Sequence, residues 1–110
     1  MSKTVDVKLY KLKRDLDDRL SLINLDLDDM QDYIGGIKKH FKDYYAPVYQ
    51  GTLADDKNVN TILNQCTNLF TVNRPNDFSD KLEFSDIIVL DNNLRDNCYF
   101  YDPYGWQEVV

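Results

Sequence analysis

The sequence lacks any apolar run near the roughly 18 residues that a membrane-spanning helix requires. Its first residues, MSKTVDVKLYKLKRD, contain no apolar core of the kind found in a signal peptide. Cysteine is scarce, with only Cys66 and Cys98, and no N-x-S/T glycosylation acceptor is present. Together these absences predict a cytoplasmic protein without disulfides and without membrane association.

Signatures of catalysis and of metal binding are also missing. None of the four glycines lies in a phosphate-binding loop. The single histidine, His40, stands in the segment KKHFK, where no cysteine or aspartate follows the spacing of a zinc site. A calcium loop starting at Asp26 fails, because Met30, Gln31 and Ile37 occupy its fifth, sixth and twelfth positions. We therefore expect no enzyme activity, no cofactor and no metal, and we interpret His40 as an exposed helix residue.

Negative charge is what the sequence has in excess. It holds 19 Asp and Glu against 13 Lys and Arg, which gives a net charge of −6. Direct nucleic-acid binding needs clustered Lys and Arg, yet after residue 57 only Arg74, Lys81 and Arg95 remain. The charge fits a protein partner with a basic surface. The acidic residues early in the chain form either a solvated, helix-capping face or a patch that contacts such a partner. The candidate contacts in this region are Asp17, Asp18, Asp26, Asp28, Asp29 and Asp32.

The first half of the chain predicts two strands and a long helix. Residues 4–12 alternate, which places Val5, Val7, Leu9 and Lys11 on one face of a half-buried strand. After a polar turn, LSLINL at 20–25 predicts a second strand that pairs with the first as a hairpin. Asp26 is a good N-cap. The stripe Met30, Ile34, Ile37, Phe41 and Tyr44 then indicates an amphipathic helix, kinked or broken at Gly35-Gly36 and ending before Pro47.

The second half predicts a strand, a helix and three further strands. PVYQGTL is a short strand, and the stripe from Val59 to Phe70 is a helix that buries Cys66. Residues 72–81 are a loop. SDIIVLD is a strand buried on both faces. After a turn at 92–97, CYFY is its partner, with Cys98 facing the sheet, and WQEVV is the last strand. Whether the two cysteines approach each other is left open.

These elements predict one domain over residues 1–110 in the order ββαβαββ. The class is α+β: a small mixed, mostly antiparallel sheet of about five strands, with two helices packed on one face.

Aromatic residues gather near the C-terminus. Tyr99 and Tyr101 share one face of their strand, Phe100 lies on the other, and Tyr104 follows in the turn. Three interpretations remain for Tyr99, Tyr101 and Tyr104: a sheet face packed on helices, a protein-binding patch, or a platform for stacked bases. The scarcity of nearby basic residues disfavours the third. The tyrosines are therefore kept with the aspartates as candidate partner contacts.

From residue 44 to 109 the chain resembles the YodL-like domain, a small domain of Gram-positive bacteria and their mobile elements. The similar segments are YYAPVYQGTL, NVNTILNQCTNLF, NRPNDF, FSDIIVL and CYFYDPYGWQEV, in the family's order. The clearest are the Ser85-Asp86 pair before an apolar strand, and the Tyr, Asp and Gly-aromatic ending. The resemblance implies no catalytic residues.

A second resemblance is one of type, to the small acidic anti-CRISPR proteins of mobile elements. It implies an inhibitor that binds a host nucleic-acid-handling protein, most concretely one that blocks guide RNA or target loading by a type II RNA-guided nuclease. Such nucleases hold nucleic acid in a strongly basic channel. The alternatives are a protein-binding accessory module of a conjugative element and, less in keeping with the composition, a metal-dependent ribonuclease. A free sheet edge after Gly105 would allow a homodimer.

Overall fold

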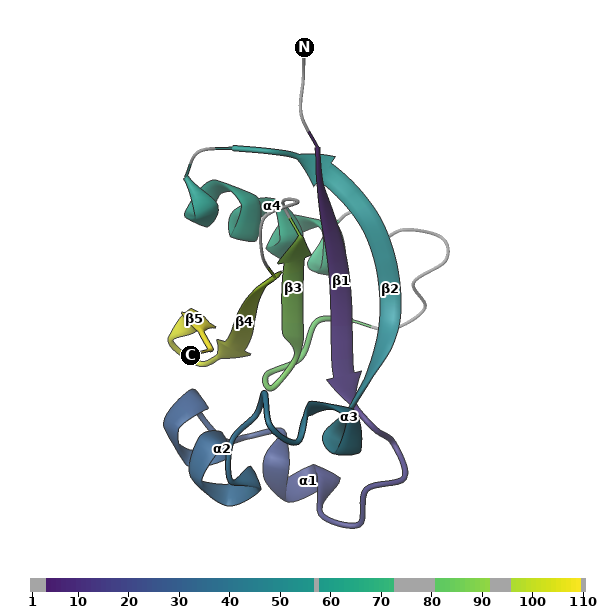
Figure 1. The fold of residues 1–110 in the computed structure, drawn as a ribbon, viewed down its shortest axis with the longest axis vertical. Coiled ribbons are helices and arrows are strands. Elements are labelled where there is room, and N and C mark those ends of the chain that lie inside the picture. The colour runs from purple at the N-terminus through teal and green to yellow at the C-terminus, as the bar shows by residue number, and fades with distance from the viewer. Residues whose placement is uncertain (1–3, 57, 73–80, 92–95, 110) are drawn as a thin grey trace.

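The computed structural model describes residues 4–56, 58–72, 81–91 and 96–109. A five-stranded sheet runs through it in the order β2-β1-β3-β4-β5, and every ladder is antiparallel (Figure 1). The expected α+β class with five strands is confirmed, and none of the ladders is parallel. The strands are β1 (Thr4–Leu12), β2 (Tyr45–Ala54), β3 (Ile87–Asp91), β4 (Asp96–Asp102) and β5 (Gly105–Glu108).

Strand β1 follows its predicted alternation, but its neighbours are distant in sequence. Val5, Val7, Leu9 and Lys11 are all buried. β1 pairs with β2 on one side and with β3 on the other. The predicted hairpin partner at residues 20–25 is wrong: part of that segment forms the one-turn helix α1 (Arg19–Leu22). A short apolar run fits a helix as well as a strand, and the polar turn before it does not distinguish the two.

The predicted helix break at the two glycines is confirmed. Helix α2 (Leu27–Ile34) ends at Gly35, which has φ +81°, and Gly36 follows with φ +111°. Both values lie in the left-handed region that glycine adopts without strain. The chain then turns and forms the short helix α3 (Phe41–Tyr44) before β2 begins.

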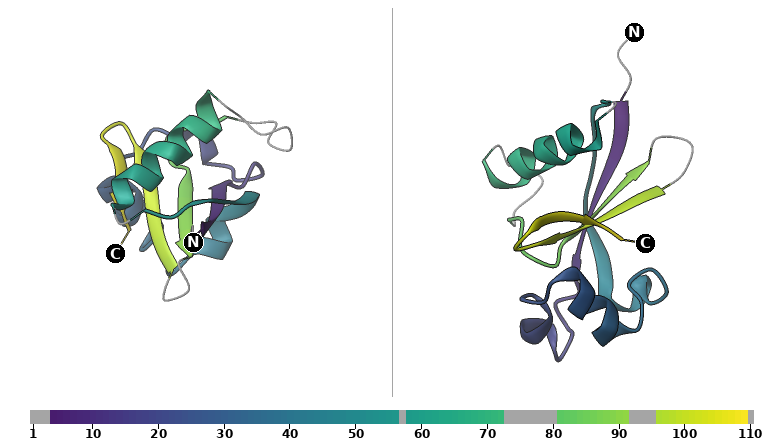
Figure 2. Two further views of the ribbon diagram at one scale, coloured as in Figure 1. Left: turned by 90° about the horizontal axis from the view of Figure 1, so that it is seen from above. Right: turned by 90° about the vertical axis from the view of Figure 1, so that its left-hand side faces the viewer.

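Helix α4 (Val59–Thr71) is the amphipathic helix that the second half predicts. Its side chains Ile62, Leu63, Cys66 and Phe70 are buried against Val5, Val7, Leu9, Ile88, Leu90 and Tyr99 of the sheet. Helix α4 therefore covers one face of the sheet, as the end-on view also shows (Figure 2).

The other face of the sheet packs on the helices of the first half. Met30, Ile34 and Ile37 join Ile87, Phe100 and other side chains in a second core. Helices α1, α2 and α3 gather at the end of the molecule where β1 finishes (Figures 1 and 2). The helices thus cover both faces, and the expectation that they pack on one face is wrong in this detail. Ile34 and Ile37, on either side of the break at Gly35-Gly36, both lie in this second core.

Strand β3 is the central strand, as its apolar sequence predicts. Ile88 and Leu90 point into the core beneath α4, whereas Ile87 points into the second core. The two cysteines lie on opposite faces, with Cys66 in the first core and Cys98 in the second, and both are free thiols.

The predicted loop at 72–81 and turn at 92–97 fall largely outside the described residues. Among the helices described, none is long and apolar enough to cross a membrane.

Candidate functional site

The net charge of the protein is concentrated in one segment. Residues 15–34 contain seven aspartates and a single basic residue, Arg19, which gives the segment a charge of −6. The rest of the chain carries twelve acidic and twelve basic residues, so this segment accounts for the whole net charge of −6. It includes α1 and α2, which lie together at one end of the molecule. We call residues 15–34 the acidic end.

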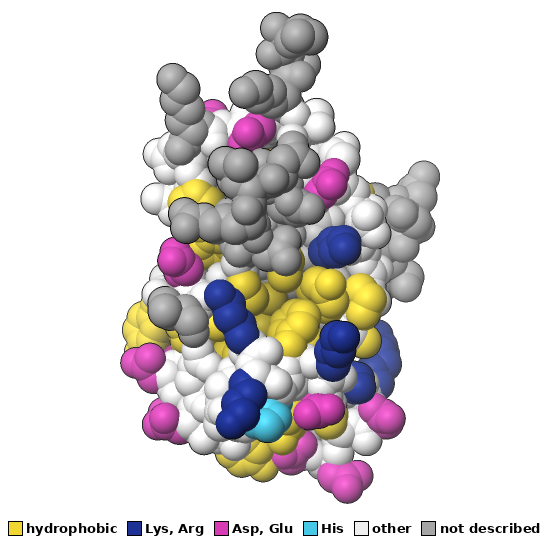
Figure 3. All heavy atoms as spheres, viewed as in Figure 1, with side chains coloured by type: hydrophobic (Ala, Val, Ile, Leu, Met, Phe, Trp, Pro, Cys, Tyr) yellow, Lys and Arg dark blue, Asp and Glu magenta, His cyan; other side chains and the backbone are white. Residues whose placement is uncertain are grey.

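The structure brings the six predicted aspartates into the acidic end and leaves most of them in solvent. Asp17, Asp28, Asp29 and Asp32 are exposed. None of the six aspartates forms an ion pair with a described residue. In the space-filling view, acidic side chains line the lower margin of the molecule (Figure 3). The four exposed aspartates are therefore accessible to a partner.

Asp18 and Asp26 have structural partners instead. The Tyr33 hydroxyl of α2 donates to Oδ2 of Asp18, the residue before α1, at 2.6 Å. This hydrogen bond, with the nearby carboxylate charge, raises the pKa of Tyr33 above its ordinary value. Asp26 Oδ1 accepts from the backbone N–H of Asp29, as its predicted N-cap role requires.

A second carboxylate fixes the start of α2 from the sheet. Asp102, at the end of β4, is buried. One of its oxygens accepts from the backbone N–H of Leu27 at 3.2 Å, and the other from that of Tyr104 at 2.9 Å. Asp102 therefore joins the β4–β5 turn to the N-terminus of α2. Sequence reasoning did not find this role, because the two segments are 75 residues apart in the chain.

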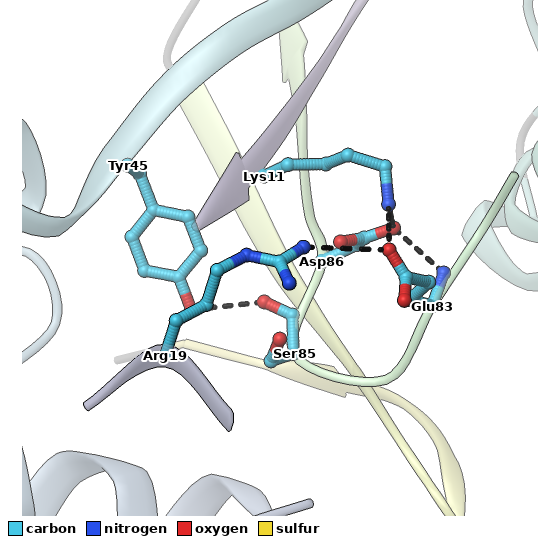
Figure 4. A network of polar contacts seen from close by, with 6 residues as sticks. All are labelled: Lys11, Arg19, Tyr45, Glu83, Ser85 and Asp86. Carbon is cyan, nitrogen blue, oxygen red and sulfur yellow. Dashed lines mark hydrogen bonds and ion pairs between the residues drawn. The ribbon is translucent and has the colours of Figure 1, made fainter. Parts of the chain in front are cut away.

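A buried polar network connects β1 to the residues before β3 (Figure 4). Lys11 Nζ contacts Asp86 Oδ2 at 2.9 Å and Glu83 Oε1 at 3.0 Å. Asp86 Oδ2 also accepts from the backbone N–H of Glu83 at 2.8 Å. Arg19 of α1 reaches Glu83 at 3.6 Å, so the network continues into the acidic end.

Burial dominates the electrostatics of Asp86. Loss of solvent raises the pKa of this carboxyl to about 7, and the ammonium and hydrogen bonds of Lys11 keep the rise from being larger. The hydroxyl of Tyr45 is buried beside it and donates to the carbonyl of Ser85 at 2.9 Å. Burial, and then the charge of Asp86, raise the pKa of Tyr45 well above its ordinary value.

Ser85 is a point of backbone strain in this network. Its φ is +80°, unusual for a residue with a side chain, and it is buried. Its N–H donates to the carbonyl of Tyr101 at 2.7 Å, while the N–H of Tyr101 donates to the carbonyl of Asp86 at 2.9 Å. These bonds continue the β3–β4 pairing through the turn and hold Ser85 in its strained conformation. The Ser85-Asp86 pair is thus explained by the fold, because Ser85 makes the turn and Asp86 pairs with Lys11.

The three candidate tyrosines do not form one surface. Tyr99 is buried under α4, with 8% of its surface exposed. Tyr101 is half-buried between Phe84 and Trp106, with ring centroids 5.6 and 4.7 Å away. Tyr104 is 80% exposed in the turn. Tyr99 is therefore not accessible to a partner in this structure. Of the three candidate tyrosines, only Tyr104 is largely exposed to solvent.

A shallow hollow lies beside Tyr101. It measures about 350 Å³ and is lined by Ile23, Asn24, Lys81, Leu82, Glu83, Phe84 and Tyr101. Because Glu83 is already engaged by Lys11 and Arg19, the hollow offers no free carboxylate for chemistry.

Groups suited to nucleophilic or metal chemistry are not assembled in the described part of the chain. His40 precedes α3 and contacts Asp43 at 3.6 Å near the surface. The Cys66 thiol is buried, which raises its pKa to about 12 and keeps it protonated. No group of three potential metal ligands occurs among residues 4–56, 58–72, 81–91 and 96–109.

The family model of the YodL-like domain covers residues 6–110. The match extends the expected region of similarity, residues 44–109, into the N-terminal half, and so includes most of β1 with Lys11, the acidic end and the network around Asp86. Neither the curated proteins nor the solved structures gave a match.

Proposed function

The chain belongs to the YodL-like domain family, and we propose that it is a non-enzymatic binding protein whose acidic end engages a basic surface on a protein partner. The observation that carries this proposal is the placement of charge. The whole net charge of −6 lies in residues 15–34, a segment that includes α1 and α2 at one end of the molecule.

The exposed aspartates are suited to attract a basic partner. Asp17, Asp28, Asp29 and Asp32 face solvent without a cationic partner among the described residues. Clustered charge of one sign raises the rate of encounter with a surface of opposite sign and opposes binding to acidic surfaces. Selective, rapid binding to a basic protein is the behaviour that this arrangement favours.

The acidic end is also rigidly attached to the sheet. Asp102 holds the N-terminus of α2, Arg19 of α1 contacts Glu83, and Met30 and Ile34 are packed in the second core. A surface that is ordered before binding loses less conformational entropy when the complex forms. These contacts support a preformed docking surface.

The most concrete partner that we propose is a type II RNA-guided nuclease. We propose that the chain is an inhibitor from a mobile element, acting in the bacterial cytoplasm by blocking guide RNA or target loading. The nuclease holds its nucleic acid in a positively charged channel through backbone contacts. Carboxylates placed in that channel would compete with phosphates for the same lysine and arginine side chains.

Reconstitution tests this function. The purified chain is added to several nuclease orthologues before guide RNA, or after guide RNA and before target DNA, and complex formation and cleavage are measured. We expect a stable complex with at least one orthologue and a loss of cleavage that depends on the order of addition. Unimpaired cleavage and no complex across the panel would overturn the nuclease assignment. Recovery of conjugative transfer proteins in a pull-down would instead favour the accessory module.

A further inference from the structure

Part of the sheet face opposite α4 is not covered by helices. In register across the four strands β2, β1, β3 and β4, Gln50, Lys8, Val89 and Cys98 lie side by side. Directly paired residues of antiparallel strands point to the same face, and Cys98 identifies this as the face of the second core. Figure 3 shows an apolar area in the middle of this side, with basic side chains on either side of it.

Two hollows meet on this area. One of about 350 Å³ is lined by Tyr10, Lys38, Phe41, Val89 and Cys98. The other, of about 370 Å³, is lined by Lys8, Tyr10, Pro47, Val48, Tyr49 and Gln50. Since both are bounded by Tyr10, we treat them as one groove, the Tyr10 groove. Its floor is apolar and aromatic, with Tyr10 packed edge-on against Phe41 at 4.7 Å between centroids.

The charged residues that line the Tyr10 groove are both lysines. Lys8 and Lys38 are exposed, and neither forms an ion pair with a described residue. Lys42 of α3 is exposed next to Phe41. Asp6 lies one position further along the same face of β1, so the positive side of the groove is the side toward α3. No residue of the acidic end lines the groove, and the two surfaces are therefore distinct.

We propose that the Tyr10 groove is a second docking surface, which binds an amphipathic acidic segment of a protein partner. Apolar side chains of the segment would pack on Tyr10, Phe41 and Val89, and its carboxylates would reach Lys8 and Lys38. Apolar anchors in a groove supply affinity, and flanking charges supply register and selectivity. Two lining lysines in a protein of net charge −6 are too few for a nucleic-acid backbone, which needs a basic track. The chain would then hold two partners through surfaces of opposite charge.

Peptide selection tests the groove. A displayed library of random peptides, each about 15 residues long to match helix-in-groove ligands, is panned on the full-length protein. The recovered peptides are then titrated against the protein labelled for amide NMR. We expect peptides in which large apolar residues recur every three or four positions with Asp or Glu between them, and amide shifts centred on Tyr10 and Val89.

Charge variants decide whether the lysines act as proposed. The double variant Lys8→Glu and Lys38→Glu should weaken peptide binding about tenfold or more, because two attractions become repulsions. Lys39→Glu, an exposed lysine outside the groove lining, should leave binding within about twofold. Both variants change exposed side chains, and thermal unfolding verifies that each is folded.

Results from three kinds of measurement would overturn the proposal. The first is recovery of basic or neutral peptides only, or binding that the double lysine variant leaves unchanged. The second is tighter binding of a single-stranded DNA oligonucleotide than of any peptide at the same lysines. The third is self-association in light scattering that Val89→Asp abolishes in a protein that stays folded, since this would assign the groove to a second copy of the chain.

Discussion

Lys11 and Asp86 form a buried ion pair, 2.9 Å long, between β1 and the residue before β3. Their side chains are 5% and 3% exposed, so neither charge is solvated by water to any large extent. Glu83 and, through it, Arg19 extend the pair to the acidic end. The relationship links the centre of the sheet to the surface that we propose as the docking site.

Removing one partner of this pair should be costly. Lys11→Met leaves Asp86 buried without its cation, and we expect the free energy of unfolding to fall by about 3 kcal/mol. Adding Asp86→Asn should recover about 1 kcal/mol, because a neutral amide oxygen still accepts from the Glu83 N–H. Urea unfolding of the single and double variants measures both changes. A double variant less stable than Lys11→Met by the full cost of Asp86→Asn alone would contradict the coupling.

Stability should depend on pH through Asp86. Its pKa is raised to about 7 in the folded protein against an ordinary value of 3.8. Between these values the folded state keeps a proton that the unfolded state has lost. Stability from this group therefore decreases as pH rises and levels off above about pH 7, with a slope of up to about 1.4 kcal/mol per pH unit. Urea unfolding from pH 5.5 to 8 should show this slope in the wild type relative to Asp86→Asn. If the stability of the wild type and of Asp86→Asn changed with pH in the same way, this dependence on Asp86 would be refuted.

Asp102 should hold the acidic end to the sheet. Asp102→Ala removes the acceptors of two backbone N–H groups, and we expect a loss of about 1–2 kcal/mol in stability. The amide of Leu27 should exchange its hydrogen faster than in the wild type. Tyr104→Ala, in the same turn but exposed, serves as the control and should change stability by less than about 0.5 kcal/mol. Equal exchange at Leu27 in both variants would mean that α2 is held by its packing alone.

Cys66 should be chemically silent in the folded protein. It is fully buried, and its pKa is raised to about 12. Since the thiolate is the reactive form, a thiol reagent should label Cys66 only at the rate of unfolding or local opening. Mass spectrometry of protein labelled with and without urea separates Cys66 from Cys98. Rapid labelling of Cys66 without urea would contradict the packing of α4 on the sheet.

Local pattern predicted the elements whose burial is periodic. The apolar stripe from Val59 to Phe70 predicts a helix with one buried face, and the continuous apolar run of β3 predicts a strand buried on both faces. Each element was found where predicted. The interruption at Gly35 and Gly36 was also predictable, because glycine is unfavourable inside a helix and readily adopts positive φ. The short run at 20–25 carries no such information, since four to six apolar residues fit either a strand or a helix.

The candidate site was only partly predictable for a different reason. The aspartates of the acidic end could be read from the sequence, because charge at a helix start stays in solvent. Lys11 was placed on the inner face of β1, but its partners lie 72 and 75 residues away. A lysine on an apolar strand face does signal a buried carboxylate, yet not which one. Tyr99 and Tyr101 differ in exposure because α4 covers the first, and Trp106 and Phe84 flank the second.

The central claim is that the acidic end binds a basic protein surface. The most direct test is the dissociation constant for the nuclease that reconstitution identifies, measured by calorimetry at low and high salt. The test variant is Asp28→Asn, Asp29→Asn and Asp32→Asn together. The control removes three exposed carboxylates elsewhere, by Asp6→Asn, Asp55→Asn and Glu108→Gln. We predict that the test variant binds about tenfold or more weakly and depends less on salt, whereas the control binds as the wild type does. Equal affinity of the two variants, or an affinity that salt does not change, would contradict the claim.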